Sequence, residues 1–138
     1  MDVADLRKRI LRELTPPASA DRKAAADAAR QGYERLLAGV IAPLLKQTSN
    51  ILKAEGWLCE VHTPSESARL AFASSPETYI EFYLDSTPPA HVIGRSSVRR
   101  KGGIDVQERI VGAGRAVEDL TEDDVLAYLL PELSLILR

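Results

Sequence analysis

The sequence predicts an α+β fold, in which an antiparallel meander of about five strands packs on a long kinked N-terminal helix and a C-terminal helix. Three observations lead to this prediction. Apolar residues recur every three or four positions over residues 20–55 and again after residue 121. Five short segments between them alternate apolar and polar residues. The connections between these segments are short, which favours antiparallel neighbours.

A chain of 138 residues, 45% of them hydrophobic, has the composition of one globular domain. At this length, folding buries roughly two-thirds of the unfolded surface, which is enough for one core. We therefore expect a single α+β domain over residues 1–138. Within it we expect an amphipathic N-terminal arm (1–14), a Pro-rich linker (15–19) and a globular core (20–138).

The arm is predicted to be a helix over residues 2–14. Its apolar residues have helical spacing and its basic residues take the other side. The apolar set is Val3, Leu6, Ile10 and Leu14, and the basic set is Arg7, Lys8, Arg9 and Arg12. Pro16 and Pro17 should end this helix, because proline disfavours helix in the residue before it.

The long helix should begin after Ser19, a good N-cap residue, and continue to Glu55. Gly39 and Pro43 fall inside it, so we expect a kink there. Gly56 has the place of the left-handed residue that ends a helix.

The five predicted strands are separated by turns rich in Pro, Ser and Gly. They cover residues 57–62, 68–72, 79–84, 91–99 and 104–110. A hairpin turn at 101–103 joins the last two strands. One sheet face should pack on the long and the last helices, and the other should meet solvent or a second copy.

The final helix is predicted to begin at Thr121, because Asp124 three residues later resembles a capping box. Pro131 should kink this strongly apolar helix or restart it. The acids of residues 118–124 suit a helix start better than a divalent-ion site, because they offset the helix dipole.

Charge and cysteine content indicate which classes of protein and which compartments this sequence fits. The chain has 18 Lys and Arg against 20 Asp and Glu, and this balance argues mildly against a dedicated nucleic-acid domain. A single cysteine, Cys59, fits a reducing compartment. No signal peptide or spanning apolar run is visible, so we expect a cytoplasmic protein with no membrane association. The high Arg and Ala content suggests a bacterial source.

Known catalytic and nucleotide-binding patterns are missing from the sequence. Cys59 and His62 have the spacing of half a metal site, but positions three apart on a strand point to opposite faces. We therefore expect no catalytic residues, no metal and no cofactor, and the sequence favours a non-enzymatic protein. An enzyme or small-ligand binder with a pocket between the sheet and the helices stays open.

The most unusual local feature is a basic run on the predicted hairpin. Its cations are Arg95, Arg99, Arg100 and Lys101. Arginine, serine and backbone donors together can bind phosphate, so these four residues are candidate nucleic-acid or phosphate ligands. The alternative is a charged strand edge that discourages aggregation, or one that faces the acids of 118–124.

We predict that the protein is a non-catalytic protein–protein interaction module, and that its partner includes a second copy in a homodimer. The arm, the apolar last helix and the tyrosines Tyr79 and Tyr83 on the second sheet face support this prediction. The alternative function is a nucleic-acid-binding module that uses the 95–101 hairpin.

Overall fold

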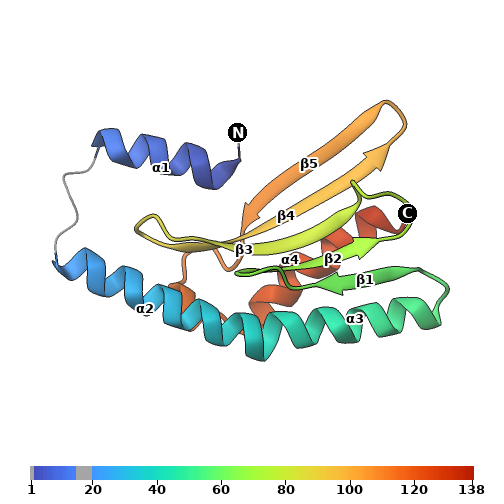
Figure 1. Ribbon diagram of the computed structural model, residues 1–138, viewed down its shortest axis with the longest axis horizontal. Helices are drawn as coiled ribbons and strands as arrows, with labels where there is room; N and C mark the ends of the chain where they lie inside the picture. The colour runs from blue at the N-terminus through green and yellow to red at the C-terminus, as the bar shows by residue number, and fades with distance from the viewer. Residues whose placement is uncertain (1, 15–19) are drawn as a thin grey trace.

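The computed structural model describes residues 2–14 and 20–138, so the predicted linker 15–19 lies outside the described residues. The fold is α+β, as predicted (Figure 1). The elements are α1 (Val3–Leu14), α2 (Ala20–Leu36), η1 (Leu37–Ile41), α3 (Ala42–Ala54), β1 (Cys59–His62), β2 (Ser67–Phe72), β3 (Tyr79–Asp85), β4 (His91–Arg100), β5 (Gly103–Ile110), η2 (Val117–Asp119) and α4 (Glu122–Ile136).

The five strands form one antiparallel sheet in the order β1-β2-β3-β4-β5, which confirms the predicted meander. The strands pair in sequence order because each connection is a short turn. The register places Phe82 of β3 opposite Ala68 of β2 and Gly94 of β4. These three residues therefore share one face of the sheet.

The prediction that the long kinked helix is N-terminal is wrong. Helix α1 precedes the long helix, which is central in the chain. Its irregularity is a π-helical turn, η1, between α2 and α3. Pro43 has no N–H to donate four residues back. The turn widens next to it, and the N–H of Ala42 donates to the carbonyl of Leu37, five residues back.

The end of α3 explains why the first strand begins later than predicted. The Gly56 N–H donates to the Lys53 carbonyl at 3.0 Å, and the Trp57 N–H donates to the Leu52 carbonyl at 2.8 Å. This pair of bonds is a Schellman motif with Gly56 in a left-handed conformation, at φ 95°. Trp57 still belongs to the helix end, so it is exposed and the strand begins at Cys59.

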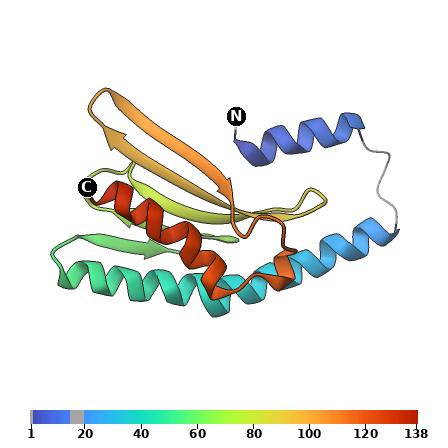
Figure 2. The ribbon, with the colours of Figure 1, turned by 180° about the vertical axis from the view of Figure 1, so that it is seen from behind.

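The core lies on the sheet face that α2, α3 and α4 cover (Figure 2). Leu129 and Leu133 of α4 belong to the same buried cluster as Ile80 and Phe82 of β3, and Leu84 packs against this cluster. The rings of Phe82 and Tyr128 meet edge to face, with centroids 5.4 Å apart.

Helix α4 begins with the predicted capping box. The Thr121 hydroxyl accepts from the Asp124 N–H, and the Asp124 carboxylate accepts from the Thr121 N–H. Pro131 lies inside this helix and does not end it, since α4 continues to Ile136. No helix in the described ranges is long and apolar enough to cross a membrane.

Candidate functional site

The sheet face turned away from α2, α3 and α4 is the candidate site, and we call it the open face. Four charged residues cross it, one on each of β2, β3, β4 and β5. They are Arg69, Glu81, Arg95 and Glu108. The register places each directly opposite the next, so positive and negative charges alternate along the row. We call this row the charge ladder.

The ladder residues pair with their neighbours. Arg69 approaches the Glu81 carboxylate at 3.0 Å, and Arg95 approaches the other oxygen of Glu81 at 3.3 Å. Arg95 also lies 3.6 Å from Glu108. The Glu81 and Glu108 side chains are only 10% and 9% exposed, so each depends on these partners for its charge.

Two tyrosines lie beneath the arginines of the ladder. The Arg69 guanidinium stacks 3.9 Å from the ring centroid of Tyr79, and the Arg95 guanidinium 4.9 Å from that of Tyr83. The Tyr83 hydroxyl donates to Glu108. Burial and this bond raise the pKa of Tyr83. The tyrosines that the sequence predicts on this face are therefore present, but they are half-buried under cations.

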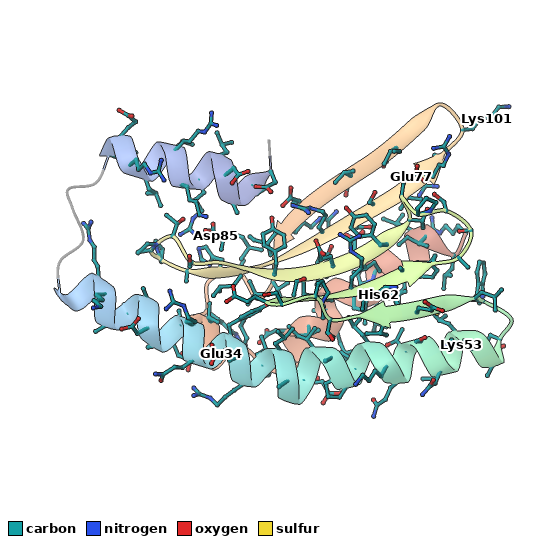
Figure 3. All side chains as sticks on the ribbon, in the orientation of Figure 1. Glu34, Lys53, His62, Glu77, Asp85 and Lys101 are labelled. Carbon is teal, nitrogen blue, oxygen red and sulfur yellow. The ribbon has the colours of Figure 1, made fainter. Side chains whose placement is uncertain are left out.

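Helix α1 lies on the open face at the end near the β3–β4 loop (Figures 1 and 2). Asp2 pairs with Arg95 at 3.1 Å, which ties the start of this helix to the ladder. Arg7 pairs with Asp85 at 2.7 Å and donates to the Pro89 carbonyl. The Asp85 side chain is fully buried (labelled in Figure 3).

The polar anchoring of α1 changes which of its sides faces the sheet. Ala4 is buried and Arg7 and Leu11 are half-buried, and these three positions lie on one helix face. The predicted apolar stripe lies outside this contact. Its members are exposed to different extents: Val3 36%, Leu6 51%, Ile10 48% and Leu14 74%. We call this set the arm stripe.

Strand β5 adds a second exposed apolar set on the open face. Ile104 and Val106 are each 50% exposed and Ile110 is 37% exposed. They alternate with polar residues along the strand, because successive side chains of a strand point to opposite faces of the sheet. The open face therefore carries two exposed apolar sets, the arm stripe on α1 and these residues on β5, in addition to the charge ladder, whose charges are paired.

The structure does not bring the four cations of the basic run together. Arg95 is part of the ladder, and Arg99 lies 3.4 Å from Glu77. Arg100 donates to the Leu135 carbonyl on the α4 side, and Lys101 lies in the hairpin turn (Figure 3). The acids of 118–124 lie elsewhere, at the start of α4.

The Cys59–His62 pair lies on opposite faces of β1. Cys59 is buried in the core, with Sγ 3.4 Å from the Ser49 hydroxyl. His62 is exposed on the open face beside Glu60. Within residues 2–14 and 20–138, no three His, Cys, Asp or Glu side chains gather as metal ligands would.

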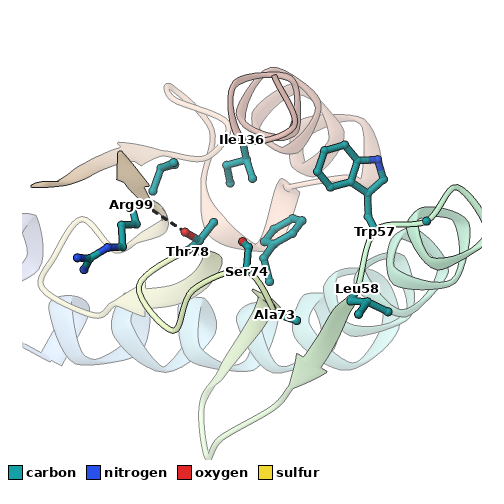
Figure 4. Close-up of a pocket in the computed structure, with 10 residues that line it drawn as sticks. Trp57, Leu58, Ala73, Ser74, Thr78, Arg99 and Ile136 are labelled. Carbon is teal, nitrogen blue, oxygen red and sulfur yellow. Dashed lines mark hydrogen bonds between the residues drawn. The ribbon is translucent and has the colours of Figure 1, made fainter. Parts of the chain in front are cut away.

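A pocket of about 400 Å³ lies at one end of the sheet, between the start of β1, the β2–β3 turn and the end of α4 (Figure 4). Trp57, Leu58 and Ile136 contribute apolar walls. Among the described residues that line the pocket, Arg99 is the only charged one, and its backbone N–H donates to the Thr78 hydroxyl at 3.2 Å. This pocket offers an apolar wall and one cation that is already paired with Glu77.

The ladder was not predicted from the sequence, although Arg69 and Glu81 each interrupt a mainly apolar strand. A charge in the middle of a strand was the available signal. Its partner could not be assigned, since pairing depends on a register that becomes visible only in the folded sheet.

Comparisons with protein-family models, with curated proteins and with solved structures give no match for this chain.

Proposed function

We propose that this chain is a non-catalytic protein–protein interaction module that uses α1 as its docking arm. The observation that supports this most is the orientation of α1. An amphipathic helix usually turns its apolar stripe to the core. Here α1 attaches through Asp2, Ala4 and Arg7 and leaves Leu6 and Ile10 half exposed.

This orientation suits a helix that meets a second protein. Exposed apolar side chains in a contiguous row are typical of contact surfaces. The stripe repeats at positions three or four apart, which is the pattern that an apolar groove accepts from an amphipathic helix. The charge ladder offers no free acid or base that would favour a catalytic function over docking, because its charges pair with one another.

Site-specific photo-crosslinking tests the proposal. A benzophenone amino acid is placed at Ile10, and at Glu34 on the exposed side of α2 as a matched control. We expect irradiation in producing cells to give one discrete adduct from position 10 and none from position 34. Leu6→Ser should abolish the adduct, since it removes a neighbouring member of the arm stripe.

The mass of that adduct identifies the partner as a second copy or as another protein. An absent adduct at position 10, or one that Leu6→Ser leaves unchanged, would contradict the proposal. Circular dichroism of Leu6→Ser provides the folding control, because Leu6 is half exposed and its loss should leave the core intact.

The alternative, nucleic-acid binding through the 95–101 hairpin, has weaker support. Arg95 is paired with Glu81 and Asp2, and Arg100 points to the α4 side. Four phosphate contacts would give a log–log salt slope of roughly −3 to −4. Fluorescence anisotropy with mixed DNA and RNA oligonucleotides at low salt tests this, and micromolar binding that Arg99→Ala with Arg100→Ala abolishes would favour the alternative.

A further inference from the structure

We infer that β5 pairs with β5 of a second copy of this chain, antiparallel about a two-fold axis at Gln107, so that two five-stranded sheets join edge to edge. The inference goes beyond the proposed docking of α1, because it adds a second surface and commits to one partner for it, another copy of this chain. The surface is the outer edge of β5, with which no other strand of the described residues pairs, although the Val3 N–H of α1 donates to the Glu108 carboxylate at 3.4 Å.

The edge of β5 lacks two common protections against strand pairing, a bulge and a proline, although it carries the charges of Asp105, Glu108 and Arg109. The strand has eight residues and pairs with β4 through eight consecutive residue pairs, without a bulge. It contains no proline. All its residues except Glu108 are exposed. A long, regular, exposed edge strand of this kind is a template for another strand.

The free backbone groups of this edge can be assigned. The Val111 N–H donates to the Val92 carbonyl on β4 at 2.8 Å. In an antiparallel ladder, alternate residues point their N–H and C=O to the same neighbour. The intervening positions therefore point outward, and they are Ile104, Val106, Glu108 and Ile110. In the proposed pairing, these positions exchange about eight backbone hydrogen bonds between the copies.

The side chains of β5 select the register. Two-fold antiparallel pairing can be centred on any residue from 105 to 109. Centres at Asp105, Glu108 and Arg109 place two like charges directly opposite each other, and a centre at Val106 places no opposite charges together. A centre at Gln107 places Asp105 opposite Arg109 of the second copy, twice by symmetry.

The rest of the strand agrees with this register. Ile104 comes opposite Ile110 of the second copy, which covers two side chains that are 50% and 37% exposed in the single chain. Asp105 forms no ion pair within the described residues. Arg109 is 59% exposed and 3.9 Å from Glu132, so its guanidinium can still reach another carboxylate.

Cysteine crosslinking tests the register. In a non-hydrogen-bonded antiparallel pair the two Cα atoms lie about 4.5 Å apart, within reach of a disulfide. Gln107→Cys should therefore form a covalent dimer with itself on mild oxidation of the full chain. Asp105→Cys is the matched control, since its two copies would lie roughly 13 Å apart at about 3.3 Å per residue. The native Cys59 is buried and does not compete.

Charge exchange tests the same pairs without a covalent bond. Sedimentation equilibrium is measured over about 10 to 300 micromolar, because a strand-edge interface is small and weak. Asp105→Arg and Arg109→Asp should each weaken self-association several-fold, since each places like charges opposite. The double variant should restore it. Glu60→Arg on the other edge strand, β1, is the matched control and should leave self-association unchanged.

Gln107→Cys crosslinking together with rescue in the double variant supports the inference. A monomer across the whole concentration range overturns it. Crosslinking from Asp105→Cys that equals or exceeds that from Gln107→Cys, or absent rescue, overturns the register. A failed β5 pairing with a retained Ile10 adduct leaves the proposed function standing, whereas loss of the adduct alone contradicts that function and not the β5 pairing.

Discussion

Gly94→Ala should destabilise the protein, because Gly94 lets the ring of Tyr128 pack against the backbone of β4. A Cβ at this position would lie 2.4 Å from Cζ, 2.5 Å from Cε2 and 2.7 Å from Cε1 of Tyr128. Carbon atoms in contact are normally about 3.5–4.0 Å apart, so the ring would have to retreat by roughly 1 Å. Phe82, which is fully buried, packs against the edge of this ring and restricts that retreat.

The magnitude follows from two opposing terms. Overpacking a buried site costs about 1–3 kcal/mol. Replacing glycine with alanine inside a strand returns about 0.5–1 kcal/mol of backbone entropy. Because the Cβ would lie only 2.4 Å from a ring carbon, the overpacking cost should lie in the upper half of its range. The free energy of unfolding should therefore fall by roughly 1–2.5 kcal/mol, and Tm by about 3–12 °C for a domain of this size.

Chemical denaturation of the full chain measures the effect, with Gly39→Ala as the matched control. A Cβ at Gly39 meets nothing within 4 Å, and this helical position should gain up to about 1 kcal/mol with alanine. In a Tyr128→Leu background the cost of Gly94→Ala should shrink, since the ring carbons that it meets are gone. An unchanged cost in that background, or a Gly94→Ala variant as stable as the parent, would refute the reasoning.

Five further substitutions test other parts of the structure. Tyr128→Phe should leave stability equal or raise it by about 1 kcal/mol, because the buried Tyr128 hydroxyl has no hydrogen-bond partner among the described residues. Thr121→Ala should cost about 1 kcal/mol through loss of the cap of α4, as measured by urea unfolding. The backbone N–H of Thr121 lowers the pKa of Asp124, so that carboxylate stabilises the fold above its unfolded pKa of about 3.9. This contribution should be lost as the pH falls through the lower folded pKa, and Asp124→Asn should remove the dependence. Arg95→Ala should cost about 1–3 kcal/mol because it leaves Glu81 without one partner, whereas Arg99→Ala should stay within about 0.5 kcal/mol in the same melts.

Local signals in the sequence were sufficient to predict most of the elements. Alternation predicted the five strands, and the Thr121–Asp124 pair predicted the start of α4. Errors arose where two local rules competed. Trp57 continues the alternation of β1, but its N–H completes the helix-ending bonds around Gly56. The helix end therefore determines the conformation of this residue.

The candidate site was harder to predict from the sequence, because its residues come from four different strands. Arg95 belongs to the basic run in the sequence, and the fold places it between Glu81 and Glu108. Its neighbours along the chain point elsewhere, since a strand alternates its side chains between two faces. The orientation of α1 was equally hidden, because it depends on the buried carboxylate of Asp85, which is far away in the sequence.

The polar attachment of α1 and its exposed arm stripe have a common physical basis. A helix that packed its apolar side against the sheet would have no apolar surface left for contact with a partner. Here the buried pair of Arg7 with Asp85 determines where the helix docks, since removing either partner would leave an uncompensated buried charge. The second pair, Asp2 with Arg95, is more exposed and adds little stability in salt. The docking position of α1 therefore depends mainly on one specific ion pair, and its apolar surface stays available for association.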